Sequence, residues 1–391
     1  MLVRAVFLLA LAGFASILSL RVSDPLLPLL ADSFGILPGA ASISITAFGI
    51  GYGVFQILHG AVGDRIGKFQ LMIVLAALSA LGSFACALAP GLPTLLAARF
   101  FTGAMTGGII PLSMAWIGDT VPYEKRQAFI ARYLLGNFLG MALGPVAAGY
   151  MAEAWGWRAP FHVIGVIYIV ITAVFWFEMR ANPMTRKFEP AGSSLLGVFK
   201  GMWRLLDDRW VRVILFTVMF SGAFLFAPVS FVPLHAQFRF GIGPGDSSMI
   251  LIAYAAGSMT FAFASGHLVR MLGERGLLLW GGVFLMAGWP VYAMVPNAAA
   301  ALLPVFLAGF GTFCVHNTIQ VHATQMAPHA RGSSMALFAA SLFISQSLAV
   351  GVWGAIVDGF GTTPLFLTCA LGAAGMALVF RRSVKGHRSR V

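Results

Sequence analysis

The sequence predicts an all-α integral membrane protein with about twelve membrane-spanning helices. Of its 391 residues, 59% are hydrophobic and only 10% are charged, whereas about a quarter of the residues of an average soluble domain are charged. A soluble chain of this length would need a charged exterior, so most of this surface is expected to face lipid. The apolar runs are continuous and lack the alternation of a barrel strand, which indicates helices.

Each apolar run approaches the ~20 residues that a helix needs to cross a bilayer. The first run follows Arg4 and resembles a signal peptide, but Arg21 and Asp24 stand where a cleavage site requires small residues. We therefore expect this run to be retained as the first span, and its length predicts that it is tilted or broken. The predicted spans are 4–34, 40–61, 70–90, 92–117, 128–152, 160–177, 211–234, 248–269, 276–296, 298–324, 334–357 and 362–380.

The basic residues gather on one side of the predicted topology. Of the 25 Lys and Arg residues, only Arg158 and Arg239 fall on the opposite side, while Arg21 and Arg99 lie inside spans. The positive-inside rule then places both termini in the cytoplasm. Because no eukaryotic targeting signal is present, we expect a multi-pass protein of a bacterial inner membrane. The net charge of +12 has this topological cause, so no nucleic-acid partner is expected.

The chain contains two copies of one six-span unit. We predict an N-terminal six-helix half at 1–178, a cytoplasmic linker at 179–208, and a C-terminal six-helix half with a short basic tail at 209–391. In a duplicated bundle of this kind, the binding site lies between two halves that rock about it. A shift of 206 residues superposes Gly60 on Gly266, Gly67 on Gly273, Gly103 on Gly309, Pro122 on Pro328, and Lys125 on Arg331.

The connection between the second and third predicted spans carries a dense motif. Gly60 is expected to let helices approach closely, and Gly67 is expected to adopt a left-handed turn. Asp64 is placed to face a helix N-terminus, whereas Arg65 and Lys68 require acidic partners. Alternatively, these charges only anchor the loop at the membrane surface.

This motif resembles the G-x-x-x-D-R-x-G-R/K loop of the major facilitator superfamily, at the same place in a twelve-span topology. The resemblance implies the major facilitator fold: twelve transmembrane helices in two pseudo-symmetric six-helix halves, a central cavity, and a monomeric protein. It also implies that the loop acts as a conformational latch together with Asp119, the acid at the end of the fourth span. The second copy is degraded, because Arg270 stands where the first has Asp64.

Glycines recur at four-residue spacing in the fifth predicted span, which predicts a flat stripe for close helix packing. The pattern resembles one that is characteristic of the proton-driven exporters of the family, although Ala148 stands where that pattern often has another glycine. It implies the branch of bacterial twelve-span drug or metabolite:proton antiporters similar to sugar-efflux permeases, and it favours export over uptake. The residues of this motif are Gly136, Gly140, Gly144, Pro145 and Gly149.

Asp24, Arg21 and Arg99 are the candidates for proton coupling and for the central cavity. A charge in hydrocarbon is costly, so each is expected to face the interior and to have a partner. Arg21 and Asp24 share a helix face and are expected to pair, and the same segment offers the expected partner for Arg99. Pro25 and Pro28 remove helical donors from nearby carbonyls. Alternatively, Arg21 and Asp24 form a helix-end pair at the outer surface, and Arg99 is structural.

Neutral polar side chains of the spans are further candidates for the substrate cavity. His316, Asn317 and Gln320 are spaced to line one side of it, and Gln56, Asn137 and His235 contribute from other spans. Each is equally compatible with a hydrogen bond between helices. The spacing of the histidines predicts no metal site, and the single cysteines indicate packing residues.

No nucleotide-binding or catalytic motif is present, which predicts neither an enzyme nor a cofactor. Work is then expected to come from an ion gradient, and a proton gains about 2.3 kcal/mol per 100 mV. We predict a secondary active transporter that exports a small organic compound by alternating access, coupled to protons. Two alternatives remain: an uptake symporter or facilitator for a small organic anion, and a membrane sensor that no longer transports.

Overall fold

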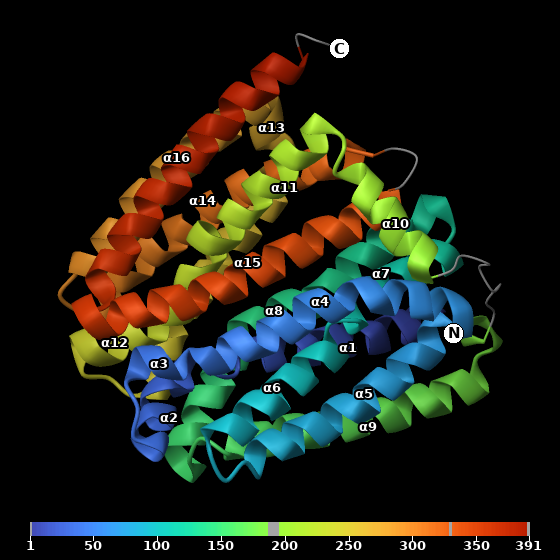
Figure 1. Cartoon of the computed structure of the whole chain (residues 1–391), viewed down its shortest axis with the longest axis horizontal. Helices are drawn as coiled ribbons and strands as arrows, with labels where there is room; N and C mark the ends of the chain where they lie inside the picture. The colour runs from blue at the N-terminus through green and yellow to red at the C-terminus, as the bar shows by residue number, and fades with distance from the viewer. Residues whose placement is uncertain (1, 187–194, 328–330, 389–391) are drawn as a thin grey trace.

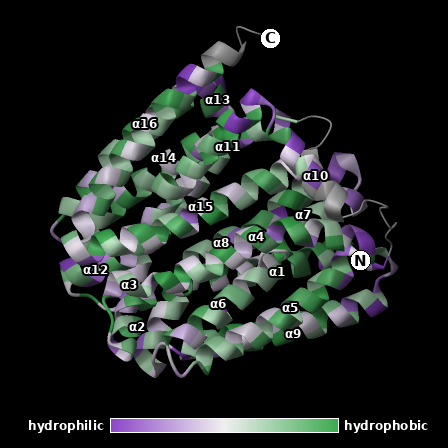
Figure 2. Cartoon of the chain, in the orientation of Figure 1, coloured by the Kyte–Doolittle hydropathy of each residue, from purple (hydrophilic) through white to green (hydrophobic). Residues whose placement is uncertain are grey.

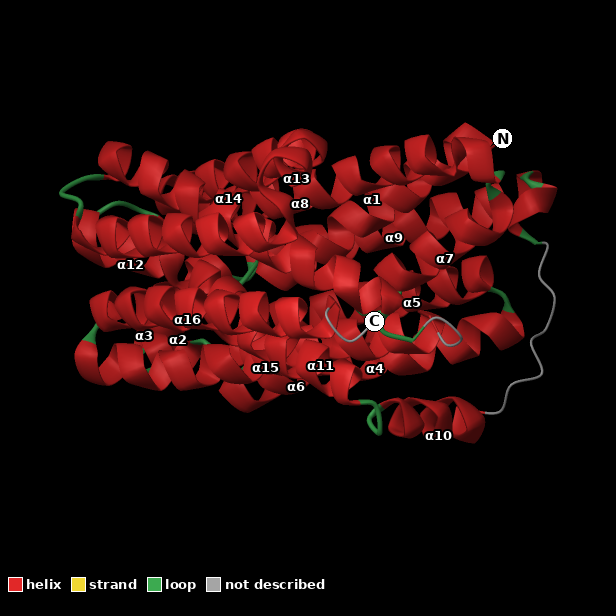
Figure 3. Ribbon diagram, turned by 90° about the horizontal axis from the view of Figure 1, so that it is seen from above, coloured by secondary structure: helices red, strands yellow, loops and turns green. Residues whose placement is uncertain are grey.

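The computed structural model of the chain describes residues 2–186, 195–327 and 331–388 (Figure 1). Over these residues it consists of helices and connecting loops (Figure 3). We refer to the spans within 2–181 as the first half and to those within 209–384 as the second half. A short helix, α10 (Leu195–Leu205), stands between the two halves along the chain.

The first half contains six spans, of which three are interrupted helices. In chain order they are α1 (Leu2–Arg21), η1 (Asp24–Leu26) and α2 (Leu27–Phe34); α3 (Pro38–Ala41) and α4 (Ile43–Ile66); α5 (Lys68–Ala87); α6 (Leu92–Thr106) and α7 (Ile109–Thr120); α8 (Tyr123–Trp155); and α9 (Ala159–Ala181), which a single turn η2 (Pro183–Thr185) follows.

The second half begins with an interrupted span and continues with long helices. In chain order they are α11 (Arg209–Ser221), η3 (Gly222–Phe226), η4 (Ala227–Phe231) and α12 (Val232–Phe240); α13 (Pro244–Met294); α14 (Ala298–Gln325); α15 (Arg331–Phe360); and α16 (Thr362–Arg388).

Helix α13 contains two spans joined without a loop. Its 51 residues would extend about 77 Å as one helix, more than twice the hydrocarbon thickness. Gly273 breaks the helix with φ 63° and ψ 172°, a conformation that residues with a side chain rarely adopt. The described chain has eleven stretches long and apolar enough to cross a membrane, one of which is α13. The predicted number of twelve spans is therefore confirmed.

The surface of the bundle is apolar where the helices face outward. Phe7, Phe263, Leu303 and Val379 are each more than half exposed, and hydrophilic residues collect toward the ends of the helices (Figure 2). A water-soluble protein rarely exposes so many large apolar side chains. This exterior suits a lipid environment.

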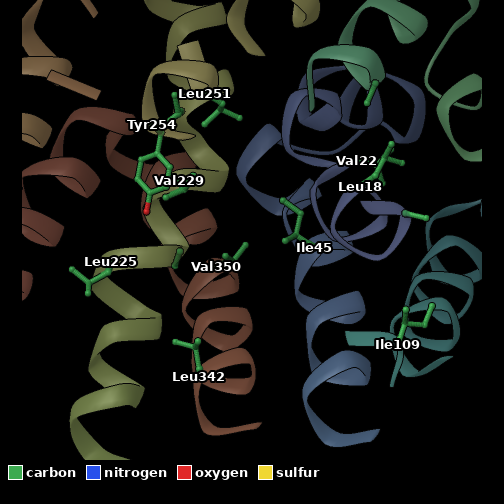
Figure 4. Packing of buried hydrophobic residues seen from close by; sticks show 14 of the residues in the cluster. Leu18, Val22, Ile45, Ile109, Leu225, Val229, Leu251, Tyr254, Leu342 and Val350 are labelled. Atoms are coloured by element: carbon green, nitrogen blue, oxygen red, sulfur yellow. The ribbon is translucent and has the colours of Figure 1, made fainter. Parts of the chain in front are cut away.

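Equivalent glycines bring equivalent helices together in the two halves. A Cβ atom on Gly103 would lie 2.0 Å from the carbonyl oxygen of Phe48, and one on Gly309 would lie 2.2 Å from that of Tyr254. Both members of the second pair follow those of the first by 206 residues. The duplication predicted from sequence is therefore present in the packing. Around these contacts a common core forms from both halves and includes Leu18, Ile45, Leu225 and Leu342 (Figure 4).

The two halves are joined on one side of the molecule. Both ends of the described chain and α10 lie on the side that we call the terminal side, whereas α2, α3 and α12 lie on the opposite, far side (Figure 1). Seven hydrogen bonds between described residues of the two halves lie in far-side portions of the spans. They link Arg21 to Ser230, Pro25 to Gln237, Gly39 to Asp358, Ser42 to Val350, Thr46 to Ser347, Tyr150 to Asp246, and Glu153 to Gly245. The structure thus has a closed far side.

Replacing Gly103 or Gly309 by Ala should lower the thermal stability of the purified protein. The added Cβ has no room beside a backbone carbonyl, and overpacking of this kind costs about 1–3 kcal/mol. Gly118→Ala is the matched control, because a Cβ there meets nothing within 4 Å and Ala is favoured over Gly in a helix by up to ~1 kcal/mol. Thermal unfolding in detergent measures all three variants. Equal melting temperatures for Gly103→Ala and the unsubstituted protein would contradict the close approach of α6 and α4.

Candidate functional site

The first and seventh spans leave the α-helical conformation at related positions. In the first span the change occurs at η1, next to Asp24, and in the seventh it occurs at η3 and η4, which contain Ser230. Residues 24 and 230 differ by the same shift of 206 that relates the two halves. The break in the first span is confirmed as predicted. The break in the seventh span was missed, although Pro228 and Pro233 inside an apolar run could have indicated it.

Side chains from other helices satisfy backbone carbonyls near these breaks. Gln237 Nε2 donates to the carbonyl oxygen of Pro25 at 3.1 Å, across the two halves. In the second half, Trp353 Nε1 donates to Ala223 at 3.0 Å and Tyr292 Oη donates to Val232 at 2.7 Å. Lipid cannot supply such partners, so non-helical backbone at this depth requires protein around it.

Arg21, Asp24 and Ser230 meet where the two interrupted spans face each other. Arg21 Nη1 donates to Asp24 Oδ2 at 3.0 Å and to Ser230 Oγ at 3.1 Å. Asp24 is completely buried and Arg21 is 5% exposed. The predicted pairing is confirmed. The pair does stand at the end of α1, as the alternative held, but it is buried and not at the outer surface. Asp24 Oδ1 is buried and has no hydrogen-bond partner, so the carboxylate is only partly satisfied.

Arg99 is buried beside this cluster and takes a partner from the first span, as expected, but that partner is the carbonyl of Ser19 and not the carboxylate of Asp24. Arg99 Nη1 donates to the carbonyl of Ser19 at 3.0 Å, and Nε donates to the carbonyl of Ser44 at 3.3 Å. The guanidinium lies 4.2 Å from the centre of the Phe48 ring, within range of a cation–π interaction. Arg99 thus ties the first span to the second, and its Nη2 has no partner.

The other polar candidates do not form one cluster. His235 Nδ1 lies 2.6 Å from Thr362 Oγ1, and His316 Nδ1 lies 3.4 Å from Ser221 Oγ. Each histidine thus makes a hydrogen bond between helices, which was the alternative to ligand binding. Both histidines are also buried among aromatic rings. Beyond His316 on α14, Asn317 is half-buried and Gln320 is exposed.

In the first half, two further candidates leave polar atoms without a hydrogen-bond partner. Gln56 is buried, and its Oε1 has no partner. Asn137 is half-buried, and its Oδ1 also has no partner. This Oδ1 packs against Gly13, where an added Cβ would lie 2.2 Å from it. Buried amide oxygens without a partner are destabilising, so these two remain the better substrate candidates. No group of three or more His, Cys, Asp or Glu residues could hold a metal ion within the described part of the chain.

The loop between α4 and α5 forms an ion-pair network in the first half. Lys68 Nζ lies 2.7 Å from Asp64 Oδ1 and 2.8 Å from Asp119 Oδ2. Gly67 has φ 98°, as its predicted turn requires. Arg65 is exposed. The close approach expected at Gly60 was wrong, because a Cβ there would meet nothing within 4 Å.

The glycine stripe of α8 packs as predicted. Cβ atoms on Gly136 and Gly140 would lie 2.2 Å and 2.7 Å from carbonyl oxygens of α1, and one on Gly144 would lie 3.2 Å from the Cα of Leu18. Gly149 instead meets the second half, 2.4 Å from the carbonyl of Pro244. Pro145 is buried within the same helix.

Twelve spans, a duplicated fold and a buried charged cluster at paired helix breaks define a multi-pass membrane transport protein. The family model described as Major Facilitator Superfamily matches residues 9–350. The chain belongs to this superfamily of transporters, which are not enzymes.

Several bacterial proteins are similar to this chain. The MFS-type transporter YybF of Bacillus subtilis (strain 168) is 23% identical over 386 residues, with 96% of this chain and 92% of YybF covered. The multidrug resistance protein Stp of Mycobacterium tuberculosis (strain CDC 1551 / Oshkosh) is 22% identical and covers 88% of this chain and 74% of Stp. The multidrug export protein EmrB of Escherichia coli (strain K12) is 26% identical, but only 51% of this chain and 40% of EmrB align.

Solved structures share the fold over nearly the whole chain. The POT family transporter PepTSo has a TM-score of 0.81 at 16% identity, with 99% of each chain covered. The xylose transporter XylE from E. coli, in a partially occluded inward open conformation, has a TM-score of 0.72 at 16% identity, with 96% of each chain covered. At these identities the likeness concerns the fold alone.

Replacing Arg99 should destabilise the protein even when the charge is kept. Arg99→Lys retains a cation but lacks the planar fork that reaches two carbonyls, and a hydrogen bond to a charged group contributes about 1.5–3 kcal/mol. We expect a lower melting temperature for Arg99→Lys and a larger loss for Arg99→Leu. Arg158→Lys is the control, since Arg158 is exposed and bonds only one carbonyl, that of Ala89. An unchanged melting temperature for Arg99→Lys would show that the two carbonyl bonds do not stabilise the first and second spans.

Proposed function

We propose that this protein is a proton-coupled exporter of a small organic compound, working by alternating access in a bacterial inner membrane with both termini in the cytoplasm. The observation that supports this proposal most directly is the bridge of Arg21 to Asp24 and Ser230, because it joins a titratable carboxylate to the opposite half. On the proposed topology, the terminal side is cytoplasmic and the far side is periplasmic. The positive-inside distribution of basic residues supports this orientation.

Protonation of Asp24 offers a physical route for coupling. As a carboxylate, Asp24 holds Arg21 in position through a charge-assisted hydrogen bond, which is stronger than a neutral one. A proton transferred to the carboxylate removes its charge, so Arg21 is no longer held against Ser230 and the contact between the halves weakens. During transport, Asp24 takes up a proton from the open far side as substrate leaves. After the far side has closed, release of that proton to the terminal side restores the bridge, so each cycle moves a proton inward.

Two further observations support export over uptake. The glycine stripe of α8 resembles the pattern of proton-driven exporters, and its members pack closely against α1 and α13. Among the similar proteins, EmrB and Stp are named for multidrug export and multidrug resistance. Inward movement of protons down their gradient supplies about 2.3 kcal/mol per 100 mV of membrane potential, which suits outward movement of the substrate.

Facilitated transport of an organic anion is the second candidate, and it would require arginines that are available to the anion. Arg21 is held by Asp24 and Ser230, and Arg99 is held by two carbonyls. Within the described chain, the buried Nη2 of Arg99 lacks a partner, and Arg21 makes both of its bonds through Nη1. This arrangement favours the coupled exporter, and the contacts carry no specific support for a sensor that does not transport.

Asp24→Asn should abolish substrate-driven proton movement. We would reconstitute the protein in liposomes that contain a pH-sensitive dye and add lipophilic cations, sugars and organic anions in turn. The unsubstituted protein should couple at least one class to a proton flux, and Asp24→Asn should lower that flux at least ~10-fold, because the amide cannot carry the proton. Asp32→Asn is the control, since Asp32 is an exposed carboxylate at the end of the same span.

Loss of folding must be separated from loss of coupling. Asp24→Asn leaves the buried Arg21 without its counter-ion, which is destabilising by about 3–5 kcal/mol. The double variant Arg21→Gln with Asp24→Asn removes both charges and should still exchange labelled substrate without protons. If substrate moves without protons in the unsubstituted protein and Asp24→Asn has no effect, the exporter is excluded and the anion facilitator becomes the better account.

A further inference from the structure

Two carboxylates on the far side each bond to a backbone N–H of the opposite half. Glu153 Oε1, on α8 of the first half, accepts from the N–H of Gly245 at 2.8 Å. Asp358 Oδ1, on α15 of the second half, accepts from the N–H of Gly39 at 2.7 Å. Gly245 and Gly39 each lie in the first turn of a spanning segment, directly after Pro244 and Pro38. The two contacts are thus the same interaction made in opposite directions.

The internal duplication relates these contacts. Pro38 and Gly39 precede Pro244 and Gly245 by 206 residues, and Gly149 and Glu153 precede Gly354 and Asp358 by 205. Each copy therefore supplies a Pro-Gly pair that starts a helix and a glycine followed four residues later by an acid. Because the acids occupy equivalent positions in both copies, their contact with the opposite half is reciprocal.

The glycines explain why the carboxylates reach their donors. A Cβ on Gly149 would lie 2.4 Å from the carbonyl of Pro244, and one on Gly354 would lie 2.3 Å from that of Gly39. The acid four residues later lies on the same helix face, one turn along. Since proline has no N–H, the glycine after it provides the first free donor of that turn.

These bonds are suited to breaking and re-forming. A carboxylate at the start of a helix is stabilised by the unsatisfied N–H groups and by the helix dipole, and the bond is charge-assisted. Glu153 is exposed and Asp358 is half-buried, so water replaces the N–H when the halves separate. On the Glu153 flank, Tyr150 Oη also donates to Asp246 Oδ1 at 2.6 Å.

We propose that Glu153 and Asp358 are a pair of gate residues that hold the far side closed, one on the α8–α13 flank and one on the α15–α3 flank. This inference rests on the alternating access of the proposed function. Opening the far side requires both bonds to break, because they lie on the two flanks by which the halves touch. Each gate residue acts on the conformational equilibrium and does not touch the substrate.

The experiment measures the width of the far side directly. Spin labels are placed on cysteines that replace Leu88, at the far-side end of α5, and Ala299, at the start of α14; both positions are exposed. The three native cysteines are buried and are replaced by alanine in the labelled background. Distances are recorded by double electron–electron resonance, without substrate, in Glu153→Gln, Asp358→Asn and the double variant. Each single variant should raise the long-distance population several-fold, and the double variant should raise it further.

Two controls make the result decisive. Asp32→Asn removes an exposed far-side carboxylate that makes no bond to the other half within the described chain, and it should leave the distances unchanged. Gly149→Trp forces a bulky side chain against Pro244 and should lengthen them. If Gly149→Trp lengthens the distances while Glu153→Gln, Asp358→Asn and the double variant do not, the gate assignment is wrong.

The distance measurement tests the gate, and the proton-flux measurement tests the coupling at Asp24, so either proposal can be excluded without the other. Longer distances in the gate variants, together with a proton flux unaffected by Asp24→Asn, would preserve the gate and exclude the coupling proposed for Asp24. Unchanged distances in the gate variants, together with a flux lost in Asp24→Asn, would preserve the coupling and exclude the gate.

Discussion

The structure depends on one constraint: backbone N–H and C=O groups inside the membrane must be hydrogen-bonded within the protein, because lipid offers them no partner. The helical spans satisfy most of their backbone groups internally, but the first and seventh spans leave the α-helical conformation beside Asp24 and Ser230. At these places the carbonyls require donors such as Gln237, Trp353 and Tyr292. The interrupted segments are consequently enclosed by other helices. The same enclosure allows a polar cluster to be buried at this depth.

The same constraint makes close helix approach important. In lipid, apolar side chains gain little from leaving their solvent, so helices associate through tight packing and hydrogen bonds. Gly103 and Gly309 provide such contacts at equivalent places within the two halves, and Gly149 and Gly354 provide them between the halves. The first two hold each half together as a unit. The second two lie at a boundary that must separate on the proposed mechanism, so carboxylates beside them provide bonds that water can replace.

The sequence alone could establish features that depend on composition and local spacing. The number of spans follows from apolar runs, the break in the first span from the length of its run, and the Arg21–Asp24 pair from a separation of three residues. Features that depend on the positions of distant helices were less accessible. The carbonyl partners of Arg99 come from Ser19 and Ser44, and no property of those residue types distinguishes them, since every residue has a carbonyl.

Other differences have the same origin. Gly60 lies in a motif that indicates close packing, yet a Cβ there would meet nothing within 4 Å, whereas a Cβ on Gly63 would lie 2.5 Å from Leu112. Which glycine of a motif faces a neighbour depends on helix rotation, and local sequence does not specify that rotation. Glu153 was likewise not recognised as a candidate, because an acid near a helix end is common and gains significance only from the N–H of Gly245 opposite it.

The depth of the contacts suggests how coupling and gating are divided. The Arg21 bridge lies at the helix breaks, whereas Glu153 and Asp358 lie farther out, at the far-side ends of α8 and α15. Weakening the Arg21 bridge alone leaves both outer bonds in place, so it biases the equilibrium without opening the far side outright. Breaking the outer bonds alone leaves the charged bridge to hold the halves together. On the proposed mechanism, each set of contacts adds to the stability of the closed far side, so loss of one set raises the open population and loss of both sets raises it further.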